Sequence, residues 1–413
     1  MTVLRAACRL AAGAATAAVT AGPALPAVFT APQAVTLSIA GRTNANPSIA
    51  AAGDAVGIVW AASVPDGGTD IYCAVSRDGG RSFGPPVKVN DADGDAQVSG
   101  EQPPRIAIGN SIVAVSWVSA RDGKTIRIAR SLDGGRTFEP SRAVSARDAP
   151  GNRGWHSMTA DSNGDVVVAW LDHRDMASTG AHHHADPSSH GTRDGAEMAQ
   201  RSALYVARVT SAGIQPERRI TTGVCYCCKT AVASTREGEV VAWRQVYAGN
   251  IRDIAFVRIA RHESPSATAS PKRVSVDNWQ LDGCPDDGPA IAIDSQSRTH
   301  LIWPTLLRDG AEPAMALFYA VSADGRTFTP RERIPTQGTP HHPQIAIAPD
   351  GSPVFAWDEL ENGVRRAAFG KGLGTRFSAG EGAYPVVAAT PDAIVTACAT
   401  GARDGSAIIV TRR

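Results

Sequence analysis

Three cysteines fall within four positions of one short stretch, VCYCCK, which spans residues 224–229. They are Cys225, Cys227 and Cys228, in a chain of 413 residues that has seven cysteines in all. Clustered thiolates are ligands that suit Cu(I) and Zn(II). In an oxidising compartment the same thiols form disulfides instead, and three cysteines cannot all pair among themselves. The chemistry of this stretch therefore depends on which other side chains the fold brings to it.

Three further segments carry cysteine or histidine just ahead of a short apolar run, as VCYCCK does. GWHS contains His156, DGCPDDGP contains Cys284, and TPHHP contains His341 and His342. Each segment stands at the same point of a unit that repeats along the chain.

The repeated unit is a hairpin of two short apolar strands joined by a tight turn rich in Gly, Asp and Asn. PRIAIGNSIVAVSW and PQIAIAPDGSPVFAW are two of the seven copies, and their β-branched, alternating pattern predicts strands rather than helices. Six copies end in tryptophan and the seventh ends in cysteine: Trp60, Trp117, Trp170, Trp243, Trp303, Trp357 and Cys398.

A third strand follows each hairpin, and in three copies it leads into a defined turn. SRDGGRSF at residues 76–83 and SLDGGRTF at residues 131–138 share the pattern Ser-x-Asp-x-Gly-x-x-Phe, and SADGRTF at residues 322–328 is one residue shorter. This pattern resembles the Asp-box of sialidase-like β-propellers. The resemblance implies that the Asp accepts turn amides, that a Gly has positive φ, and that the aromatic ring packs into the blade. Such a turn is a structural device and supplies no catalytic residue.

The repeats predict an all-β fold, a seven-bladed β-propeller with four-stranded antiparallel blades. The last copy supplies three strands, and residues 34–41, AVTLSIAG, supply the fourth, so that the N-terminal strand closes the ring. We expect a single propeller domain over residues 34–413. Six blades is the alternative count, because enzymatic sialidases have six.

In such a ring the segment before each innermost strand lies at the mouth of the central channel, where propellers bind ligands. Four consecutive blades carry cysteine or histidine there, which predicts a copper or zinc site. The thiolate candidates are Cys225, Cys227, Cys228 and Cys284, the imidazole candidates are His156, His341 and His342, and Tyr226 and Trp279 would shield the site. A disulfide from Cys284 to any one of the other three cysteines is an equal alternative.

A long loop expected on the same face would collect or cap the metal, because it is rich in histidine. It spans residues 173–190 and contains His173, His182, His183, His184 and His190.

The resemblance to sialidases also implies an alternative function, that of an exo-α-sialidase. Such an enzyme clamps a carboxylate with three arginines and uses a Tyr–Glu nucleophile pair with an Asp acid/base. The residues of these types on the expected face are Arg105, Arg174, Arg244, Asp172 and Tyr384. The R-I-P motif that would carry the first arginine has no match in GRTNANPSIA, ahead of the first hairpin, so the sequence favours a non-catalytic protein.

A third alternative is a disulfide-stapled scaffold that binds a glycan or a protein on the same face. Trp155 and Trp279 stand just ahead of innermost strands, where exposed aromatic rings would suit such a partner.

Residues 1–33 are typical of a signal peptide and linker, with Arg5 and Arg9 ahead of an Ala-rich apolar stretch. We expect cleavage, export to the periplasm or the extracellular space, and no membrane insertion of the mature chain. Lys and Arg number 41 against 40 Asp and Glu, so the charge balance gives no indication of a nucleic-acid partner.

Overall fold

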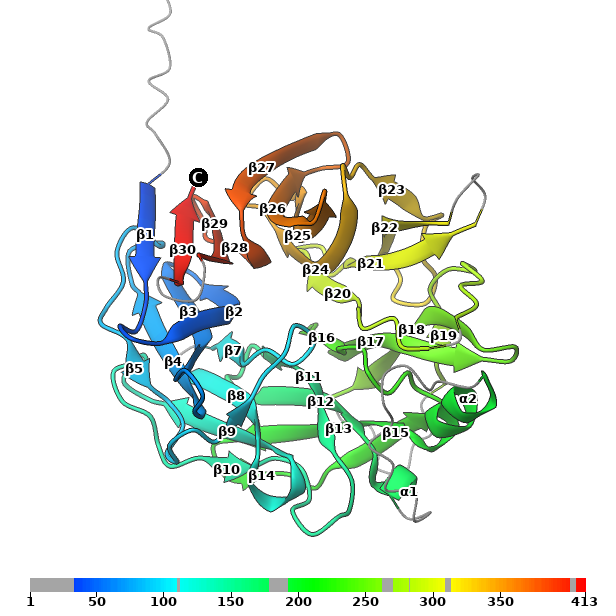
Figure 1. Ribbon diagram of the computed structural model, residues 1–413, viewed down its shortest axis with the longest axis horizontal. Helices are drawn as coiled ribbons and strands as arrows, with labels where there is room; N and C mark the ends of the chain where they lie inside the picture. Colours follow the sequence, from blue (N-terminus) through cyan, green and yellow to red (C-terminus); the bar gives the residue numbers. More distant parts are fainter. Residues whose placement is uncertain are drawn as a thin grey trace, which may run out of the picture. The chain divides into compact units, whose positions relative to one another are not determined.

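The seven predicted hairpins build seven antiparallel sheets around a central axis, as the computed structural model shows (Figure 1). The predicted seven-bladed β-propeller is therefore confirmed. The structure describes residues 33–109, 112–177, 192–261, 270–281, 283–308, 313–401 and 406–413. Residues 1–32 of the predicted signal peptide and linker lie outside these residues, as do His182, His183, His184 and His190.

The first three blades follow one another along the chain. Blade one contains β2 (Thr43–Ala52), β3 (Ala55–Ser63), β4 (Thr69–Ser76) and β5 (Val87–Lys88). Blade two contains β6 (Ala96–Gln97), β7 (Arg105–Ile108), β8 (Val113–Ser119), the 3-10 turn η1 (Arg121–Gly123), β9 (Thr125–Ser131) and β10 (Arg142–Ala143). Blade three contains β11 (Arg153–Ala160), β12 (Val166–Asp172), the helices α1 (Arg174–Ala177) and α2 (Thr192–Arg201), β13 (Ala203–Thr210), β14 (Gly213–Ile214) and β15 (Arg218–Thr222).

The remaining blades are simpler. Blade four contains β16 (Ala231–Ser234), β17 (Gly238–Tyr247), β18 (Ile251–Ala260) and β19 (Lys272–Arg273). Blade five contains β20 (Ala290–Ile293), β21 (Thr299–Leu307), β22 (Ala314–Ser322) and β23 (Glu332–Ile334). Blade six contains β24 (Thr339–Ile347), β25 (Pro353–Glu361), β26 (Val364–Lys371) and β27 (Thr375–Glu381). Blade seven contains β28 (Ala383–Ala389), β29 (Ile394–Thr400), β30 (Ala407–Arg412) and β1 (Gln33–Leu37).

The ring closes through β1, the first strand of the described chain. β1 pairs antiparallel with β30, with Gln33 opposite Arg412 and Leu37 opposite Ile408. This pairing covers the hydrogen-bonding edge of β30 and completes the last blade, as Figure 1 shows in blue and red. The predicted closure by the N-terminal strand is confirmed.

The repeated tryptophans form the contacts between blades. Trp117 of blade two belongs to one apolar cluster with Val59 and Ile71 of blade one, and Trp60 of blade one clusters with Val386 of blade seven. Six tryptophans are fully buried in this way: Trp60, Trp117, Trp170, Trp243, Trp303 and Trp357. One large apolar side chain thus fills each of six spaces between blades, which explains the spacing of the tryptophans in the sequence.

The Asp-box turns have the predicted geometry. Asp133 accepts a hydrogen bond from the Thr137 amide (3.0 Å) and one from the Ser131 hydroxyl (2.7 Å). Gly135 has φ 90°, and its amide donates to the Ser131 oxygen (2.7 Å). The turn at residues 76–83 repeats these contacts, with Gly80 at φ 86°. These polar turns end the third strands on the face opposite the channel mouth and leave the other face to the long loops.

Four innermost strands bend at the channel mouth. β2, β11, β24 and β28 each contain a β-bulge near their first residues, where the register with the second strand shifts. The first bulged residue has positive φ in all four: Asn46, Trp155, His342 and Tyr384. Bulges of this kind redirect side chains at the rims of sheets and next to functional sites.

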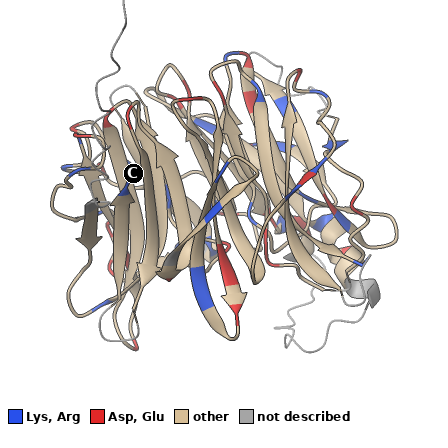
Figure 2. Cartoon of the chain, turned by 90° about the horizontal axis from the view of Figure 1, so that it is seen from above, with Lys and Arg blue, Asp and Glu red and all other residues tan. Residues whose placement is uncertain are grey.

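Charged side chains of both signs are spread over the propeller. In Figure 2 blue and red segments alternate, and neither sign gathers on one rim of the described residues. None of the helices in the described part of the chain is long and apolar enough to cross a membrane.

Candidate functional site

The cysteine stretch forms a short loop between β15 and β16 that is fixed to β17. The Cys225 amide donates to the Arg244 carbonyl (2.9 Å), and the Val246 amide donates to the Gly223 carbonyl (2.8 Å). Gly223 has φ 75°, and a Cβ there would lie 2.6 Å from the Gln245 side chain. The N-terminal end of the loop is therefore anchored to β17 at Gly223 and Cys225.

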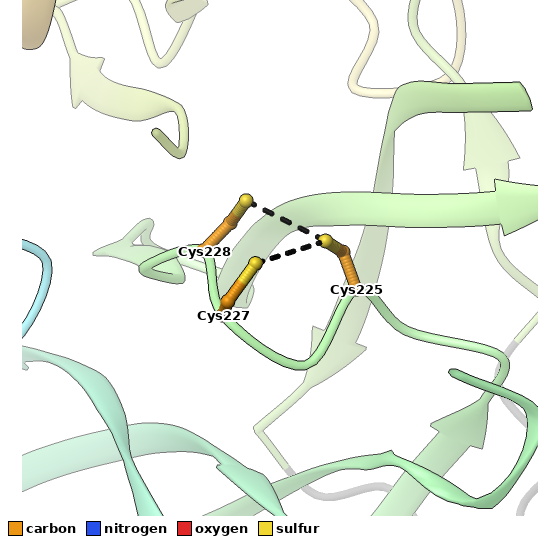
Figure 3. Close-up of side chains that lie close together, drawn as sticks. All are labelled: Cys225, Cys227 and Cys228. Atoms are coloured by element: carbon orange, nitrogen blue, oxygen red, sulfur yellow. Dashed lines mark hydrogen bonds between the residues drawn. The ribbon is translucent and has the colours of Figure 1, made fainter. Parts of the chain in front are cut away.

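The three sulfur atoms of this loop converge on one point (Figure 3). Cys225 Sγ lies 3.6 Å from Cys227 Sγ and 3.6 Å from Cys228 Sγ, and all three sulfurs lie within 4.8 Å of one another. The three residues are 1%, 8% and 1% exposed. Cys225 and Cys228 are free thiols.

Cys284, from the loop that leads into blade five, is bonded to one of these three cysteines. It forms a disulfide with Cys227, 57 positions away in the sequence, with the two Cα atoms 6.3 Å apart. The backbones of the two loops touch, because a Cβ at Gly288 would lie 2.1 Å from the Lys229 carbonyl oxygen. The structure thus brings together the four cysteines that the repeat aligned, which we call the cysteine centre. Of the three disulfides that the sequence allowed for Cys284, the structure contains the one with Cys227.

Two buried arginines surround the cysteine centre. Arg252 of β18 donates from Nη1 to Cys225 Sγ (3.1 Å) and from Nε to the Leu281 carbonyl (3.2 Å). Arg244 of β17 donates to the carbonyl oxygens of Asp287 (2.9 Å) and Pro304 (2.9 Å). They are 0% and 1% exposed, so their positive charges act at close range.

The free thiols of Cys225 and Cys228 have pKa values shifted in opposite directions. Burial alone raises the pKa of Cys225, but the contact with Cys228 and the charges of Arg252 and Arg244 outweigh burial and lower it to about 6. Burial and the neighbouring Cys225 sulfur raise the pKa of Cys228 well above its usual value. Of the two thiols, Cys225 is therefore the one that loses its proton more readily.

A buried ionic cluster lies next to the cysteines at the channel mouth. Lys229 Nζ lies 3.3 Å from Glu101 and 3.6 Å from Asp287, and it donates to the Gly288 carbonyl (3.1 Å). Its backbone amide also donates to Glu101 (2.7 Å). The three charged side chains are at most 3% exposed. Sequence reasoning missed this cluster, although Lys229 directly follows the cysteines and Asp287 lies three residues after Cys284.

The histidine candidates have partners other than the thiols. His341 Nδ1 lies 3.3 Å from Asp287, and His342 Nδ1 lies 2.8 Å from Asp358. His156 is fully buried and its Nε2 lies 2.9 Å from the Ser116 hydroxyl, while burial and the charge of Arg105 lower its pKa to about 3. Among the described residues, no imidazole or carboxylate joins the three sulfurs within 4.8 Å.

Apolar side chains cover the three cysteines of the loop. Ala199 of α2 and Val246 of β17 are buried in one cluster with these cysteines, and Tyr226 packs against it.

Trp279 stacks on a buried arginine. The guanidinium carbon of Arg244 lies 4.6 Å from the centroid of the Trp279 ring, and Trp279 is 4% exposed. The expectation of an exposed Trp279 that would bind a sugar is therefore wrong, because this ring stacks on a buried cation. Trp155 is half-buried against His173, with centroids 4.9 Å apart.

The arginines considered for a carboxylate clamp are held by the protein itself. Arg174 Nη2 lies 2.6 Å from Asp172 and 2.6 Å from Glu217. Arg105 donates from Nε to the His156 carbonyl (2.9 Å), and Arg244 is bonded to carbonyl oxygens as described. Tyr384 lies beside His342 instead, with ring centroids 4.8 Å apart.

The other two free cysteines of the described residues serve packing. Cys73 and Cys398 are 0% and 6% exposed, and burial raises their pKa values to about 12 and about 11. Cys398 lies in the apolar cluster between blades six and seven, at the position that holds tryptophan in the other repeats.

No family of known sequences matches the chain, and no curated protein is similar to it in sequence. Solved structures are similar in fold. An α-L-arabinanase of Penicillium chrysogenum in complex with arabinobiose is 12% identical over 92% of this chain and 98% of its own, with a TM-score of 0.50. A polysaccharide lyase is 10% identical over 89% of each chain, with a TM-score of 0.50. A Trypanosoma rangeli sialidase in complex with the inhibitor DANA is 10% identical over 90% of this chain and 55% of its own, with a TM-score of 0.47. At these identities the likeness shows the fold alone, which is that of the predicted β-propeller.

Proposed function

We propose that the cysteine centre binds a transition metal, copper(I) or zinc, once the bond between Cys227 and Cys284 is reduced. The observation that carries this proposal is the mutual distance of three buried sulfurs. A tetrahedral centre with metal–sulfur bonds of about 2.3 Å has sulfur–sulfur edges of about 3.8 Å. The two distances of 3.6 Å from Cys225 are close to such an edge, so little movement is needed to admit an ion.

Charge supports the same proposal. Three or four thiolates around Cu(I) or Zn(II) carry a net negative charge, which burial makes unfavourable unless cations are near. Arg252 touches Cys225, and the charges of Arg252 and Arg244 lower the pKa of Cys225. The protein thus supplies compensating charge before any metal is bound.

Ligand type favours copper(I) over zinc. The proposed donors are sulfurs alone, since His156, His341 and His342 have other partners. Soft thiolate sets suit Cu(I), and the apolar cover from Ala199 and Val246 limits the contact of Cys225, Cys227 and Cys228 with water and oxidants. The disulfide also supports, as part of the proposal, export to an oxidising compartment.

Metal affinity tests the proposal directly. The protein is reduced without oxygen, and Cu(I) or Zn(II) is titrated against a chromogenic chelator. We expect one tightly bound ion per chain in the wild type, and a loss of affinity of at least about 100-fold in Cys225→Ser, because a direct ligand is removed. Cys398→Ser, which removes a buried thiol from a different blade, serves as the matched control. An equal affinity in the wild type and in Cys225→Ser would overturn the proposal.

A glycan-active channel mouth is the second candidate, and the pairing of His342 with Asp358 favours it. The His342 ring contacts Tyr384, so an imidazole and a phenol stand side by side, as groups for acid–base catalysis do. Release of the dye from a fluorogenic sialoside, or cleavage of arabino-oligosaccharides, with loss of activity in Tyr384→Phe would support this candidate. Inactivity of the wild type on both substrates, together with unchanged metal binding in Tyr384→Phe, would leave the metal proposal alone.

A further inference from the structure

The cysteine centre holds a thiol against a disulfide. Cys225 Sγ lies 3.6 Å from the sulfur of Cys227, which is bonded to Cys284. Arg252 donates to Cys225 Sγ at 3.1 Å, a contact that favours the thiolate over the thiol. A thiolate next to a disulfide sulfur is the arrangement from which thiol–disulfide exchange begins.

We infer that the cysteine centre carries out an internal thiol–disulfide exchange that moves its disulfide from Cys227–Cys284 to Cys225–Cys228. In the first step the Cys225 thiolate attacks Cys227 Sγ. The bond between Cys225 and Cys227 forms, the bond between Cys227 and Cys284 breaks, and Cys284 leaves as a thiolate with the electron pair.

Cys228 completes the exchange. It lies 3.6 Å from Cys225 Sγ, so its thiolate can attack Cys225 in the new bond to Cys227. The bond between Cys228 and Cys225 forms, and Cys227 leaves as a thiolate. Cys225 attacks as a thiolate, so only the proton of Cys228 has to be placed, and it passes to one of the two leaving thiolates. One disulfide and two thiols are present before and after, so the exchange needs no outside oxidant or reductant.

The product pairing has a recognisable spacing. Cys225 and Cys228 form a Cys-x-x-Cys pair, the spacing of disulfide oxidoreductases. The three cysteines of the loop are at least 92% buried, whereas Cys284 is exposed. A protein disulfide from outside cannot reach the buried sulfurs, so the exchange is internal and its outcome is the release of an exposed Cys284 thiol. The inference rests on the sulfur geometry and needs no metal.

Trapping of Cys284 tests the exchange. Folded protein that carries the disulfide is incubated with a maleimide and a chelator, without reductant, and the labelled residues are identified by mass spectrometry. We expect label on Cys284, and a Cys225–Cys228 disulfide in the labelled molecules. In Cys225→Ser, labelling of Cys284 falls by about tenfold or more, because the attacking sulfur is gone. In Cys228→Ser the first step remains and Cys284 is still labelled.

Cys398→Ser is the matched control and should label Cys284 as the wild type does. If a variant fails to fold, the labelled residues and the disulfides found by mass spectrometry in the wild type still decide the test. Label on Cys225 or Cys228 with Cys227–Cys284 intact would overturn the inference. So would equal labelling of Cys284 in Cys225→Ser, or labelled Cys284 in molecules where Cys225 and Cys228 are both thiols. Because a chelator is present, failure of this experiment leaves the metal proposal untouched, and failure of metal binding leaves the exchange untouched.

Discussion

Lys229 joins the cysteine loop to the rest of the channel mouth. It balances the buried carboxylates of Glu101 and Asp287, and it follows Cys228 directly. A buried charge without its partner is strongly unfavourable, whereas a surface pair contributes little. The lysine therefore holds the loops from blades four and five at the distance that the cysteine centre needs.

Replacing this lysine should be costly. We expect Lys229→Met to lower the free energy of unfolding by about 3 to 5 kcal/mol, because two buried carboxylates lose their cation. Urea unfolding measures the effect. Lys371→Met is the matched control, since Lys371 and Asp350 are 42% and 57% exposed, and its change should stay below about 1 kcal/mol. Similar losses in both variants would show that Lys229 has no special role.

A second residue-scale prediction concerns acid. Burial raises the pKa of Asp70, but hydrogen bonds from Asn90 and the Gly94 amide and the charges of Arg42 and Lys88 outweigh it and lower the pKa to about 2. The folded pKa lies below the unfolded value, so the stabilisation is complete above about pH 4 and is lost as the pH falls towards 2.

We therefore expect Asp70→Asn to be less stable than the wild type by about 2 kcal/mol near neutral pH. The difference should shrink as the pH falls from about 4 to about 2, as the wild-type carboxylate is protonated. Chemical unfolding at several pH values measures it. A difference that stays constant over this range would contradict the assigned pKa.

At the scale of elements, the Asp-box turns depend on one backbone conformation. Gly135 has φ 90°, and a Cβ there would lie 2.5 Å from a Val75 methyl carbon of the neighbouring blade. We expect Gly135→Ala to lower the free energy of unfolding by about 2 kcal/mol, from strain and the clash together. Gly374 has open space around it, so Gly374→Ala should change stability by less than about 1 kcal/mol. Equal effects would mean that the turn tolerates a side chain.

The strands were predictable because their signals are local and repeat seven times. A tryptophan at the end of each second strand and the Ser-x-Asp turns fixed the register of the blades. The alignment of Cys284 with Cys225 followed from that register. The pairing of Cys227 with Cys284 did not, since all three cysteines of the loop were equal in the sequence. The partners of His341 and His342 could not be predicted from the sequence for a similar reason. Asp287 and Asp358 come from other strands and loops, and no sequence spacing relates them to these histidines.

At the scale of the whole molecule, the propeller depends on β1. Leu37 is 5% exposed and Val35 packs in the same cluster between blades one and seven. We expect removal of residues 1–37 to lower the free energy of unfolding by about 3 kcal/mol or more compared with removal of residues 1–32. The open edge of β30 should also promote association between chains. Urea unfolding and size-exclusion chromatography measure both effects, and equal behaviour of the two truncations would contradict the role of β1 in closure.

The ring also positions the cysteine centre. It brings together two loops at the channel mouth whose bonded cysteines, Cys227 and Cys284, are 57 positions apart in the sequence. X-ray absorption at the copper edge of reduced, Cu(I)-loaded protein tests the proposed metal binding at this centre most directly. We expect a first shell of sulfur atoms alone at about 2.3 Å, with fewer sulfurs in Cys225→Ser. A first shell of nitrogen or oxygen, or a spectrum that Cys225→Ser leaves unchanged, would contradict it.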